Sequence, residues 1–427
     1  MTIAIFTFSL LGAMALGMPI AFALLACGVA LMLHLSMFDA QIIAQNLING
    51  ADSFPLMAIP FFMLAGATMN AGGLSKRIIH VAMTLVGHIR GGLGYVVILA
   101  ACILASLSGS AAADAAAMSA LLFPMMVKSG YNPAKSAGLI ASGSIIGPMV
   151  PPSPNLILFG VIGGLSITKL FMAAIVPGLM IATGITIAWW WVARNEVLEV
   201  PPKASHKEVM QAIRDGAWAL VMPGILVFGL KFGIFTPTEA GVVCAAYAMF
   251  VSLFVYKELK FSQIYSVLAS AGQTAAIVMF LVAAALVSAW LITIAEIPQQ
   301  CIDLLRPFMG SKIALMVAIN ILVVIVGTAL DMTPTIMILT PVLLPVVVAA
   351  GIDPIYFGVV FIINNAIGLV TPPVGTTLNV VCGVTKVSMD DIIVGVLPFM
   401  YAQLVVMSLL IVFPDLVLVP MRWFMGG

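Results

Sequence analysis

The chain has 427 residues, of which 63% are hydrophobic and only 8% are charged, and its formal net charge is +1 at pH 7. Soluble domains carry about a quarter charged residues, so this composition excludes an ordinary soluble protein. The near-neutral charge gives no sign of a nucleic-acid-binding surface. Apolar runs long enough to cross a bilayer recur along the whole length, which predicts an all-α polytopic membrane protein.

Several kinds of chemistry lack their usual residue patterns. The five cysteines are dispersed without a C-x-x-C pair, as expected of small buried hydrophobic residues. No G-x-x-x-x-G-K-[ST] pattern occurs, which excludes ATP hydrolysis by a P-loop. The four histidines lie near span ends or in loops, so we interpret them as interfacial and expect no enzyme. The first basic residue is Lys76, so we expect the first span to act as its own insertion signal.

Residues 1–90 are predicted to form scaffold spans. Residues 2–33 are nearly all apolar around Gly17-Met18-Pro19, which indicates either one long kinked helix or a tight pair of helices. Residues 54–70 form another span. The loop 72–90 carries three basic residues and no acid, which predicts a cytoplasmic position by the positive-inside rule.

Residues 91–193 contain a first hairpin and a first broken helix. Apolar arms at 91–107 and 115–127 flank the polar sequence SLSGSAAAD, and lysines follow at 128 and 135. Both ends of this segment are therefore expected on the cytoplasmic side, which predicts a re-entrant hairpin with its tip at 108–110. Half-helices at 138–147 and 156–165 then flank GPMVPPSPN, whose prolines remove backbone donors, and a span at 170–193 follows.

Residues 194–312 are predicted to be a cytoplasmic linker with further scaffold spans. Two spans, 217–235 and 240–256, join the polar stretch 194–215 to the basic sequence KELK at 257–260. Both polar segments then fall on the same side of the membrane, as their basic residues require. A span at 270–294 leads to an external loop whose charges sum to zero.

Residues 313–427 repeat the arrangement of the first hairpin and broken helix. Hairpin arms are predicted at 313–326 and 332–348 with a tip at 327–330, and half-helices at 355–368 and 375–386. Fourteen residues separate Pro133 from Gly147, and 14 separate Pro354 from Gly368. The first repeat follows a basic loop and the second a neutral one, so the repeats enter the membrane from opposite sides. Inverted repeats of this kind are typical of secondary transporters.

The helix breaks predict ion and substrate ligands. Non-helical backbone at membrane depth is tolerated only where it is buried in protein or lines a wet cavity. Freed carbonyl oxygens suit a sodium ion, and the free amides of the second half-helix suit a carboxylate. The predicted ligands of the first cation site are Ser108, Ser110, Gly147, Val150 and Pro152. Those of the second cation site are Gly327, Leu330, Gly368, Thr371 and Pro373.

An anion site is predicted between the two cation sites. Its candidate residues follow the breaks or are the only acids of the hairpins: Asp114, Ser153, Asn155, Asp331, Thr376, Thr377 and Asn379. Asn364 and Asn365 are weaker candidates. The alternative is structural, in which the polar residues cap helices and the glycines and prolines only shape kinks. Charge at this depth is usually functional, and for the two acids the alternative is an N-cap-like role at the second arm of each hairpin, so both interpretations remain open.

Four stretches, SLSGSAAAD, GPMVPPSPN, GTALDMTP and GLVTPPVGTTLN, resemble the large membrane (M, DctM-like) subunit of tripartite ATP-independent periplasmic (TRAP) transporters. The resemblance covers essentially the whole chain. It implies an elevator-type ion-transporter fold and a sodium-driven importer of organic acids in a bacterial inner membrane. It also implies a separate small four-helix membrane subunit (Q type) and a periplasmic substrate-binding protein (P type).

The family's sodium positions correspond to the two sets named above, with Leu330 acting only through its carbonyl oxygen. The general similarity favours the sialic-acid members, with a C4-dicarboxylate as the alternative substrate. Two other classes of membrane protein are alternatives. A channel usually builds its rings of ligands from several subunits, and an intramembrane aspartyl protease would use Asp114 and Asp331 but lacks a matching motif around either.

Overall fold

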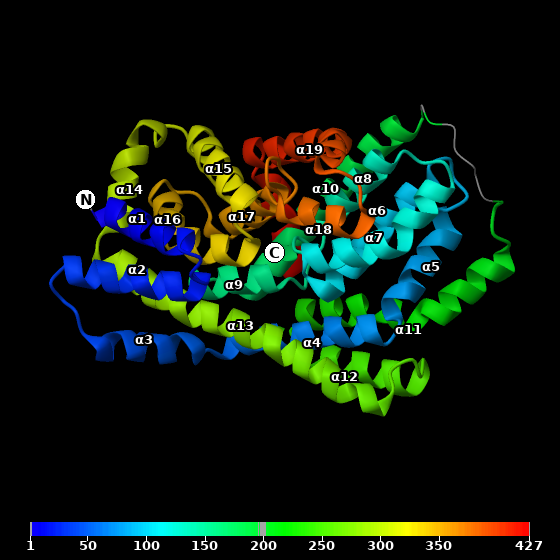
Figure 1. The fold of residues 1–427 in the computed structure, drawn as a ribbon, viewed down its shortest axis with the longest axis horizontal. Coiled ribbons are helices and arrows are strands. Elements are labelled where there is room, and N and C mark those ends of the chain that lie inside the picture. The colour runs from blue at the N-terminus through cyan, green and yellow to red at the C-terminus, as the bar shows by residue number, and fades with distance from the viewer. Residues whose placement is uncertain (1, 195, 197–201, 427) are drawn as a thin grey trace.

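The computed structural model describes residues 2–194, 196 and 202–426, without the side chains of 105–108. These residues form helices and connecting turns, and no β-strand occurs among them. Nine helices within these ranges are long and apolar enough to cross a membrane. The prediction of an all-α polytopic membrane protein is therefore confirmed (Figure 1).

The helices occur in the following chain order. The first half contains α1 (Thr2–Ala15), α2 (Ile20–His34), α3 (Ala40–Ala51), η1 (Phe54–Met57), α4 (Ala58–Ala71), α5 (Leu74–Val86), α6 (Gly92–Ser108), α7 (Ala111–Lys128), α8 (Pro133–Ser144), α9 (Pro154–Ile162) and α10 (Ile167–Ala193). The second half contains α11 (His206–Lys231), α12 (Pro237–Phe250), η2 (Val251–Val255), α13 (Phe261–Ile294), α14 (Ile297–Leu305), η3 (Arg306–Phe308), α15 (Lys312–Ala329), α16 (Met332–Ala349), α17 (Pro354–Gly368), α18 (Thr376–Thr385), α19 (Met389–Val412) and α20 (Asp415–Met425).

The N-terminal apolar run forms a tight pair of helices. Gly17 adopts a φ of +80° between α1 and α2, a left-handed conformation that glycine accommodates without steric cost. Pro19 follows and precedes the first turn of α2. The two helices pack against each other, so the pair is the correct alternative of the two left open by the sequence.

The segment predicted as a loop at 72–90 is largely helical. Its apolar residues recur at helical spacing, and α5 buries Leu74, Ile78 and Val81 against its neighbours. Lys76 and His80 between them remain exposed, and Arg77 is half-buried. The loop prediction was therefore wrong over α5, because it rested on the charges of the segment and not on its apolar periodicity. Similarly, the external loop after α13 contains α14 and η3.

A second group of helices supports the hairpins from one side. Helix α13 packs against α2, α3 and α4, and α12 packs against α4. In Figure 1, α3, α4, α12 and α13 lie along one side of the molecule, and the hairpins and broken helices lie along the other. Helix α13 also contacts α16, which places the longest helix of the described chain beside the second hairpin.

Both hairpins and both broken helices are present. The first hairpin is α6–α7 and the second is α15–α16; the broken helices are α8–α9 and α17–α18. The second hairpin turns at Leu330 and Asp331, three residues later than the start of the predicted tip, because α15 continues to Ala329. The first half-helix starts at Pro133, earlier than predicted, because Asn132 caps it by accepting a bond from the Lys135 amide at 3.1 Å.

The two repeats exchange contacts across the centre of the molecule. Helix α9 of the first repeat packs against α16 of the second, and α18 of the second packs against α7 of the first. The hairpins approach from opposite ends and point their tips toward the middle (Figure 1). This arrangement confirms the predicted fold of two oppositely directed hairpins and two broken helices.

Candidate functional site

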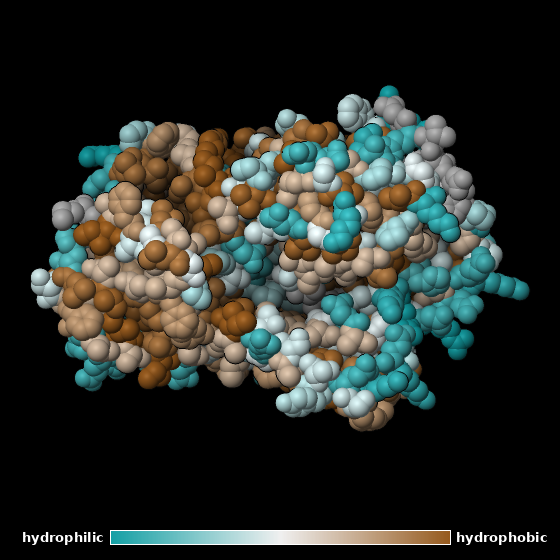
Figure 2. Space-filling model, in the orientation of Figure 1, coloured by the Kyte–Doolittle hydropathy of each residue, from teal (hydrophilic) through white to brown (hydrophobic). Residues whose placement is uncertain are grey.

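A cavity of about 210 Å³ lies where the two hairpin tips meet. Residues from six parts of the chain line it: Gly109, Ser110, Ala111 and Ala112 from the first tip, Pro154, Asn155 and Leu158 from α9, Asp331, Met332 and Thr333 from the second tip, Ile59 and Met63 from α4, Thr274 and Val278 from α13, and Leu369 from the second break. Figure 2 shows the surface hollowed near the middle of the molecule, with hydrophilic side chains at the edge of the hollow.

Three helices begin at this cavity. Helix α7 starts at Ala111, α9 at Pro154 and α16 at Met332, all of which line the cavity. A helix N-terminus carries unsatisfied amides and about half a positive charge, which favours an anion. The cavity is thus suited to a carboxylate.

Asn155 joins the two hairpins. Its side-chain nitrogen lies 3.5 Å from the Gly109 carbonyl oxygen of the first tip and 3.7 Å from the Met332 sulfur of the second. The residue is 6% exposed, so the amide is held between protein groups with one side open to the cavity. Gly109 has a φ of +59°, and a Cβ there would collide with Pro154, so the tip approaches α9 as closely as its backbone allows.

Ser153, a predicted substrate ligand, is turned into the first break. Its hydroxyl donates to the Pro148 carbonyl at 2.6 Å and accepts from the backbone N–H of Asn155 at 3.3 Å. The side chain is fully buried and is not part of the cavity wall. This geometry is that of a cap, which is the structural alternative for Ser153.

Asp114 lies against the first break. It occupies the first turn of α7 and is 4% exposed. A Cβ built on Gly147 would lie 2.5 Å from its Oδ2, so the carboxylate approaches the break directly above the backbone of Gly147. The structure therefore places this predicted substrate ligand beside the first predicted cation set.

The rest of the first predicted cation set is divided between the break and the tip of the first hairpin. Val150 donates its amide to Ile146 at 3.1 Å, and its side chain packs against Gly178 of α10. Pro152 follows a cis peptide bond after Pro151. Ser110 caps α7 and lines the cavity. Ser108 ends α6, and its side chain lies outside the described part of the structure.

The second break is docked onto the second hairpin. The Gly375 amide donates to the Thr328 carbonyl at 3.2 Å. A Cβ on Gly368 would lie 2.8 Å from the Gly327 Cα, so the two glycine backbones touch without a side chain between them. Pro373 follows a cis bond after Pro372, as Pro152 does after Pro151 in the first break.

Asn365 provides a buried oxygen at this second contact. Its side-chain nitrogen donates to the Met332 carbonyl at 3.3 Å, and its Oδ1 has no hydrogen-bond partner among the described residues. The residue is fully buried, and Oδ1 would lie 2.9 Å from a Cβ on Gly327. A buried amide oxygen without a donor is costly unless something binds it, and a cation is one such group.

Thr371 and Leu330, the remaining members of the second cation set, have local partners. The Thr371 hydroxyl donates to the Ile367 carbonyl at 2.7 Å, and the Leu330 amide donates to Val326 at 3.0 Å. Hydroxyl oxygens retain acceptor capacity in such a bond, so Thr371 can still receive a cation.

The predicted substrate ligands after the second break do not line the cavity. Thr376 begins α18, which packs against α7 and α8. Thr377 is fully buried, and its hydroxyl has no hydrogen-bond partner within the described residues. Asn379 is exposed and donates to the Val374 carbonyl at 3.3 Å.

Three of the predicted site residues, Ser110, Asn155 and Asp331, are brought together at the cavity. Asp331 is exposed and makes no side-chain cap bond to α16, so the capping alternative does not describe its geometry. Thr274 and Thr333 also line the cavity and were missed. A polar residue such as Thr274 within an apolar span was a usable signal, because polar groups at membrane depth are rarely incidental.

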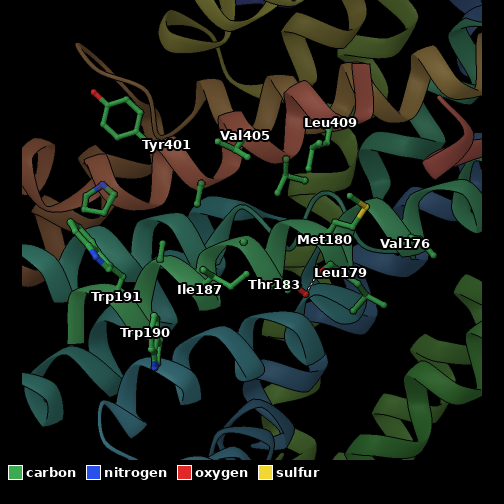
Figure 3. A pocket seen from close by; sticks show the side chains of 15 residues that line it. Val176, Leu179, Met180, Thr183, Ile187, Trp190, Trp191, Tyr401, Val405 and Leu409 are labelled. Carbon is green, nitrogen blue, oxygen red and sulfur yellow. Dashed lines mark hydrogen bonds between the residues drawn. The ribbon is translucent and has the colours of Figure 1, made fainter. Parts of the chain in front are cut away.

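A larger hollow of about 740 Å³ lies elsewhere, between α10 and α19. Figure 3 shows its side chains, which are almost all apolar, with Trp190, Trp191 and Tyr401 toward one end. Leu179, 52% exposed, and Ile187, 61% exposed, form part of its open wall. Two membrane-spanning helices form the hollow and no residue of the hairpin tips lines it, so we assign it to the lipid-facing surface.

The fold and the cavity define a polytopic membrane transporter component with two opposed hairpins. Residues 7–416 match the family described as "Tripartite ATP-independent periplasmic transporter, DctM component". The chain is 55% identical over 426 residues to the 2,3-diketo-L-gulonate TRAP transporter large permease protein YiaN of Escherichia coli K12, covering 99% of this chain and 100% of that protein. The chain therefore belongs to the DctM family of TRAP transporter large permeases.

Two further similarities refine the sequence predictions. The sialic acid TRAP transporter large permease protein SiaM of Vibrio cholerae is 35% identical over 419 residues, covering 98% of each chain. The leaning toward sialic acid is thus not favoured, because the diketogulonate permease is more similar. The crystal structure of the Alcanivorax borkumensis YdaH transporter has a TM-score of 0.64 at 15% identity, covering 92% of this chain and 91% of that one, which shows a shared fold. The relatives are named as transporter permeases, which confirms the expectation of a transporter rather than an enzyme.

Proposed function

We propose that this chain is the transport subunit of a sodium-coupled importer of an organic acid anion in a bacterial inner membrane. The observation that carries the proposal is the cavity into which three helix N-termini and both hairpin tips converge. Helix N-termini supply amides and partial positive charge for the substrate carboxylate. Side chains such as Ser110, Asn155 and Thr333 supply hydrogen bonds to its other polar groups.

The substrate we favour is a hydroxylated monocarboxylate of the sugar-acid type. The 55% identical relative is named for 2,3-diketo-L-gulonate, which is such an acid. The exposed carboxylate of Asp331 on the cavity wall supports the same choice. It would repel the second carboxylate of a C4-dicarboxylate and would accept hydrogen bonds from hydroxyl groups.

Sodium is the coupling ion we propose, bound at the two helix breaks. Hard oxygen ligands are available there from main-chain carbonyls, and the buried Asn365 Oδ1 and the Asp114 carboxylate lie beside them. Bound sodium would hold each hairpin against its break and so shape the cavity for the anion. Both hairpins and broken helices would then move as one body against α4 and α13, whose side chains form the opposite cavity wall.

The partners we propose are a small membrane subunit and a periplasmic substrate-binding protein. The family is by its description tripartite, and this chain accounts for the DctM component. The basic end of the molecule, which α5 and the start of α11 form, would face the cytoplasm by the positive-inside rule.

Uptake into proteoliposomes tests the proposal. The vesicles would contain this chain with its two partners, and uptake of radiolabelled 2,3-diketo-L-gulonate, sialic acid and succinate would be compared with and without an inward sodium gradient. Sodium-dependent uptake of 2,3-diketo-L-gulonate alone supports the proposal. Uptake of succinate instead would retain the coupling and overturn the substrate, and uptake equal in sodium and potassium would overturn the coupling.

A further inference from the structure

A polar cavity of about 690 Å³ lies at the basic end of the molecule, away from the hairpin tips. Three segments distant in sequence form it, and its lining residues are Lys76, Arg77 and His80 from α5, Arg214, Asp215 and Trp218 from α11, and Val255, Tyr256 and Glu258 after α12. Figure 2 shows hydrophilic side chains gathered at this end of the molecule, which α5 and α11 form in Figure 1.

One of its cations is already neutralised and fixed. Arg77 forms an ion pair with Glu258 at 2.5 Å and also donates to the Gly73 carbonyl at 3.2 Å. Its guanidinium lies 3.8 Å from the centre of the Tyr256 ring, a cation–π contact. The Tyr256 hydroxyl donates to the Asp215 carbonyl at 2.8 Å, so this set ties α5 to α11 and forms a rigid floor.

Two cations remain for a ligand. Neither Lys76 nor Arg214 has an ion-pair partner among the residues that the structure describes. Glu258 neutralises Arg77, and Asp215 is the other carboxylate that lines the cavity. Lys76 and Arg214 together outweigh the charge of Asp215, so the cavity keeps a net positive charge. His80 adds a further donor. A ligand that completes this cavity therefore carries negative charge and accepts several hydrogen bonds, as a phosphate group does.

The cavity continues into an apolar surface. Trp218, which is 45% exposed, lies at its border. From there an apolar stripe runs along α11 at helical spacing through Val221, Ile225, Phe228 and Phe232. Val221, Phe228 and Phe232 are 49%, 62% and 67% exposed. Tryptophan at the boundary between a charged and an apolar surface is typical of the membrane interface.

We propose that this cavity binds the phosphate headgroup of an anionic phospholipid whose acyl chains lie along the α11 stripe. An anionic amphiphile matches both halves of the surface, whereas a soluble anion would leave the stripe unused and a neutral lipid would leave Lys76 and Arg214 without a counter-charge. Basic pockets between membrane helices at this level are known to suit anionic headgroups. Such a lipid would bridge α11 and α5, the helix that connects α4 to the first hairpin.

Fluorescence quenching tests this directly because Trp218 lies at the border of the cavity. The purified, delipidated full chain in detergent would be titrated with phosphatidylglycerol carrying brominated acyl chains, with a Trp218→Phe variant to identify the signal of Trp218 among the six tryptophans. We expect quenching of Trp218 by phosphatidylglycerol at concentrations about tenfold lower than by phosphatidylcholine with the same chains. Equal quenching by the two lipids would overturn the proposal.

A charge-removal pair provides the second measurement. The double variant Lys76→Gln, Arg214→Gln should weaken phosphatidylglycerol binding about tenfold or more, because each cation near an anionic headgroup strengthens its binding. The matched control removes two cations outside the cavity, Lys128→Gln with Lys203→Gln, and should leave binding unchanged. If millimolar inorganic phosphate displaced the phosphatidylglycerol completely, the ligand would be a soluble anion. That result would overturn the proposal that a lipid binds here. If the double variant does not fold, the headgroup comparison in the unaltered chain still decides.

Discussion

The side-chain nitrogen of Asn155 lies 3.5 Å from the carbonyl oxygen of Gly109. This contact joins the start of α9 to the tip of the first hairpin, and a further 3.7 Å approach to the Met332 sulfur reaches the tip of the second. One side-chain amide thus contacts both tips and lines the cavity between them. A residue in this position can couple hairpin closure to substrate binding, because displacement of either tip changes its surroundings.

Asn155→Ala should therefore lower the kcat/KM of substrate uptake by about tenfold or more. The change removes a hydrogen bond between buried groups and a donor at the cavity, and each contributes about 1 kcal/mol. Radiolabelled uptake into proteoliposomes would measure the effect. Asn46→Ala is the control, since the Asn46 side chain donates to the Ile42 carbonyl of its own helix at 2.9 Å and lies outside the cavity between the tips. Unchanged uptake by the Asn155 variant would exclude a role at the site.

Gly368→Ala should both destabilise the protein and impair transport. The added Cβ would lie 2.8 Å from the Gly327 Cα and 2.9 Å from its carbonyl carbon, so the second hairpin must move away from its break. Overpacking of this kind typically costs about 1–3 kcal/mol.

Thermal unfolding in detergent, followed by intrinsic fluorescence, would detect the change as a lower Tm. Gly383→Ala is the matched control within α18, because a Cβ there meets nothing within 4 Å. An unaltered Tm and unaltered uptake for the Gly368 variant would show that hairpin and break need not touch.

Much of the architecture could be predicted because prolines and glycines mark it. The second broken helix was expected at 355–368 and 375–386 and is found as α17 and α18, since Pro354 and Gly375 define its boundaries. Helix α5 was missed because charge dominated the interpretation of its segment, although its apolar periodicity was available.

The residues that line the candidate site were harder to predict from the sequence than its position in the fold. Asn155 and Asp331 were predicted because they follow a break or are rare acids, whereas Thr333, which also lines the cavity, was not predicted. Spacing also could not separate Asp114, which faces the first break, from Asp331, which faces the cavity. That distinction depends on how α7 rotates against α8, and local sequence does not encode the rotation of one helix against another.

Sodium should raise the Tm of the purified chain, and Asn365→Leu should reduce this increase. A ligand that binds only the folded state stabilises it by mass action, by about 2.7 kcal/mol at 100 times its Kd. The variant replaces a fully buried Oδ1 that has no partner in the described chain by an apolar group of similar size. Thermal unfolding in sodium and in potassium chloride at equal ionic strength measures the difference. A sodium-induced increase of the same size in the variant would show that this oxygen is not a ligand.

Asp114→Asn should raise the sodium concentration needed for half-maximal uptake, with a smaller effect on the substrate KM. The carboxylate approaches the backbone of Gly147 in the first break and is nearly fully buried, so its charge acts on a nearby cation with little screening. We expect a shift of about tenfold in the half-saturating sodium concentration. A variant whose substrate KM changed while its sodium dependence did not would instead assign Asp114 to the anion.

Asp331→Asn should broaden the substrate range toward dicarboxylates. The exposed carboxylate lines the cavity between the tips and would repel a second negative charge, whereas an amide there would donate a hydrogen bond to it. We expect the ratio of succinate to sugar-acid uptake to increase by about tenfold, measured as competing kcat/KM values in the same vesicles. Asp353→Asn is the charge-matched control, since Asp353 caps α17 through the Ile355 amide at 2.8 Å and does not line the cavity. If the Asp331 variant kept the original ratio, the carboxylate would not set selectivity, and the discrimination would have to reside in the shape of the cavity and its hydroxyl groups. If it lost uptake of both acids equally, Asp331 would instead be needed for closure of the second hairpin, whose tip it forms with Leu330.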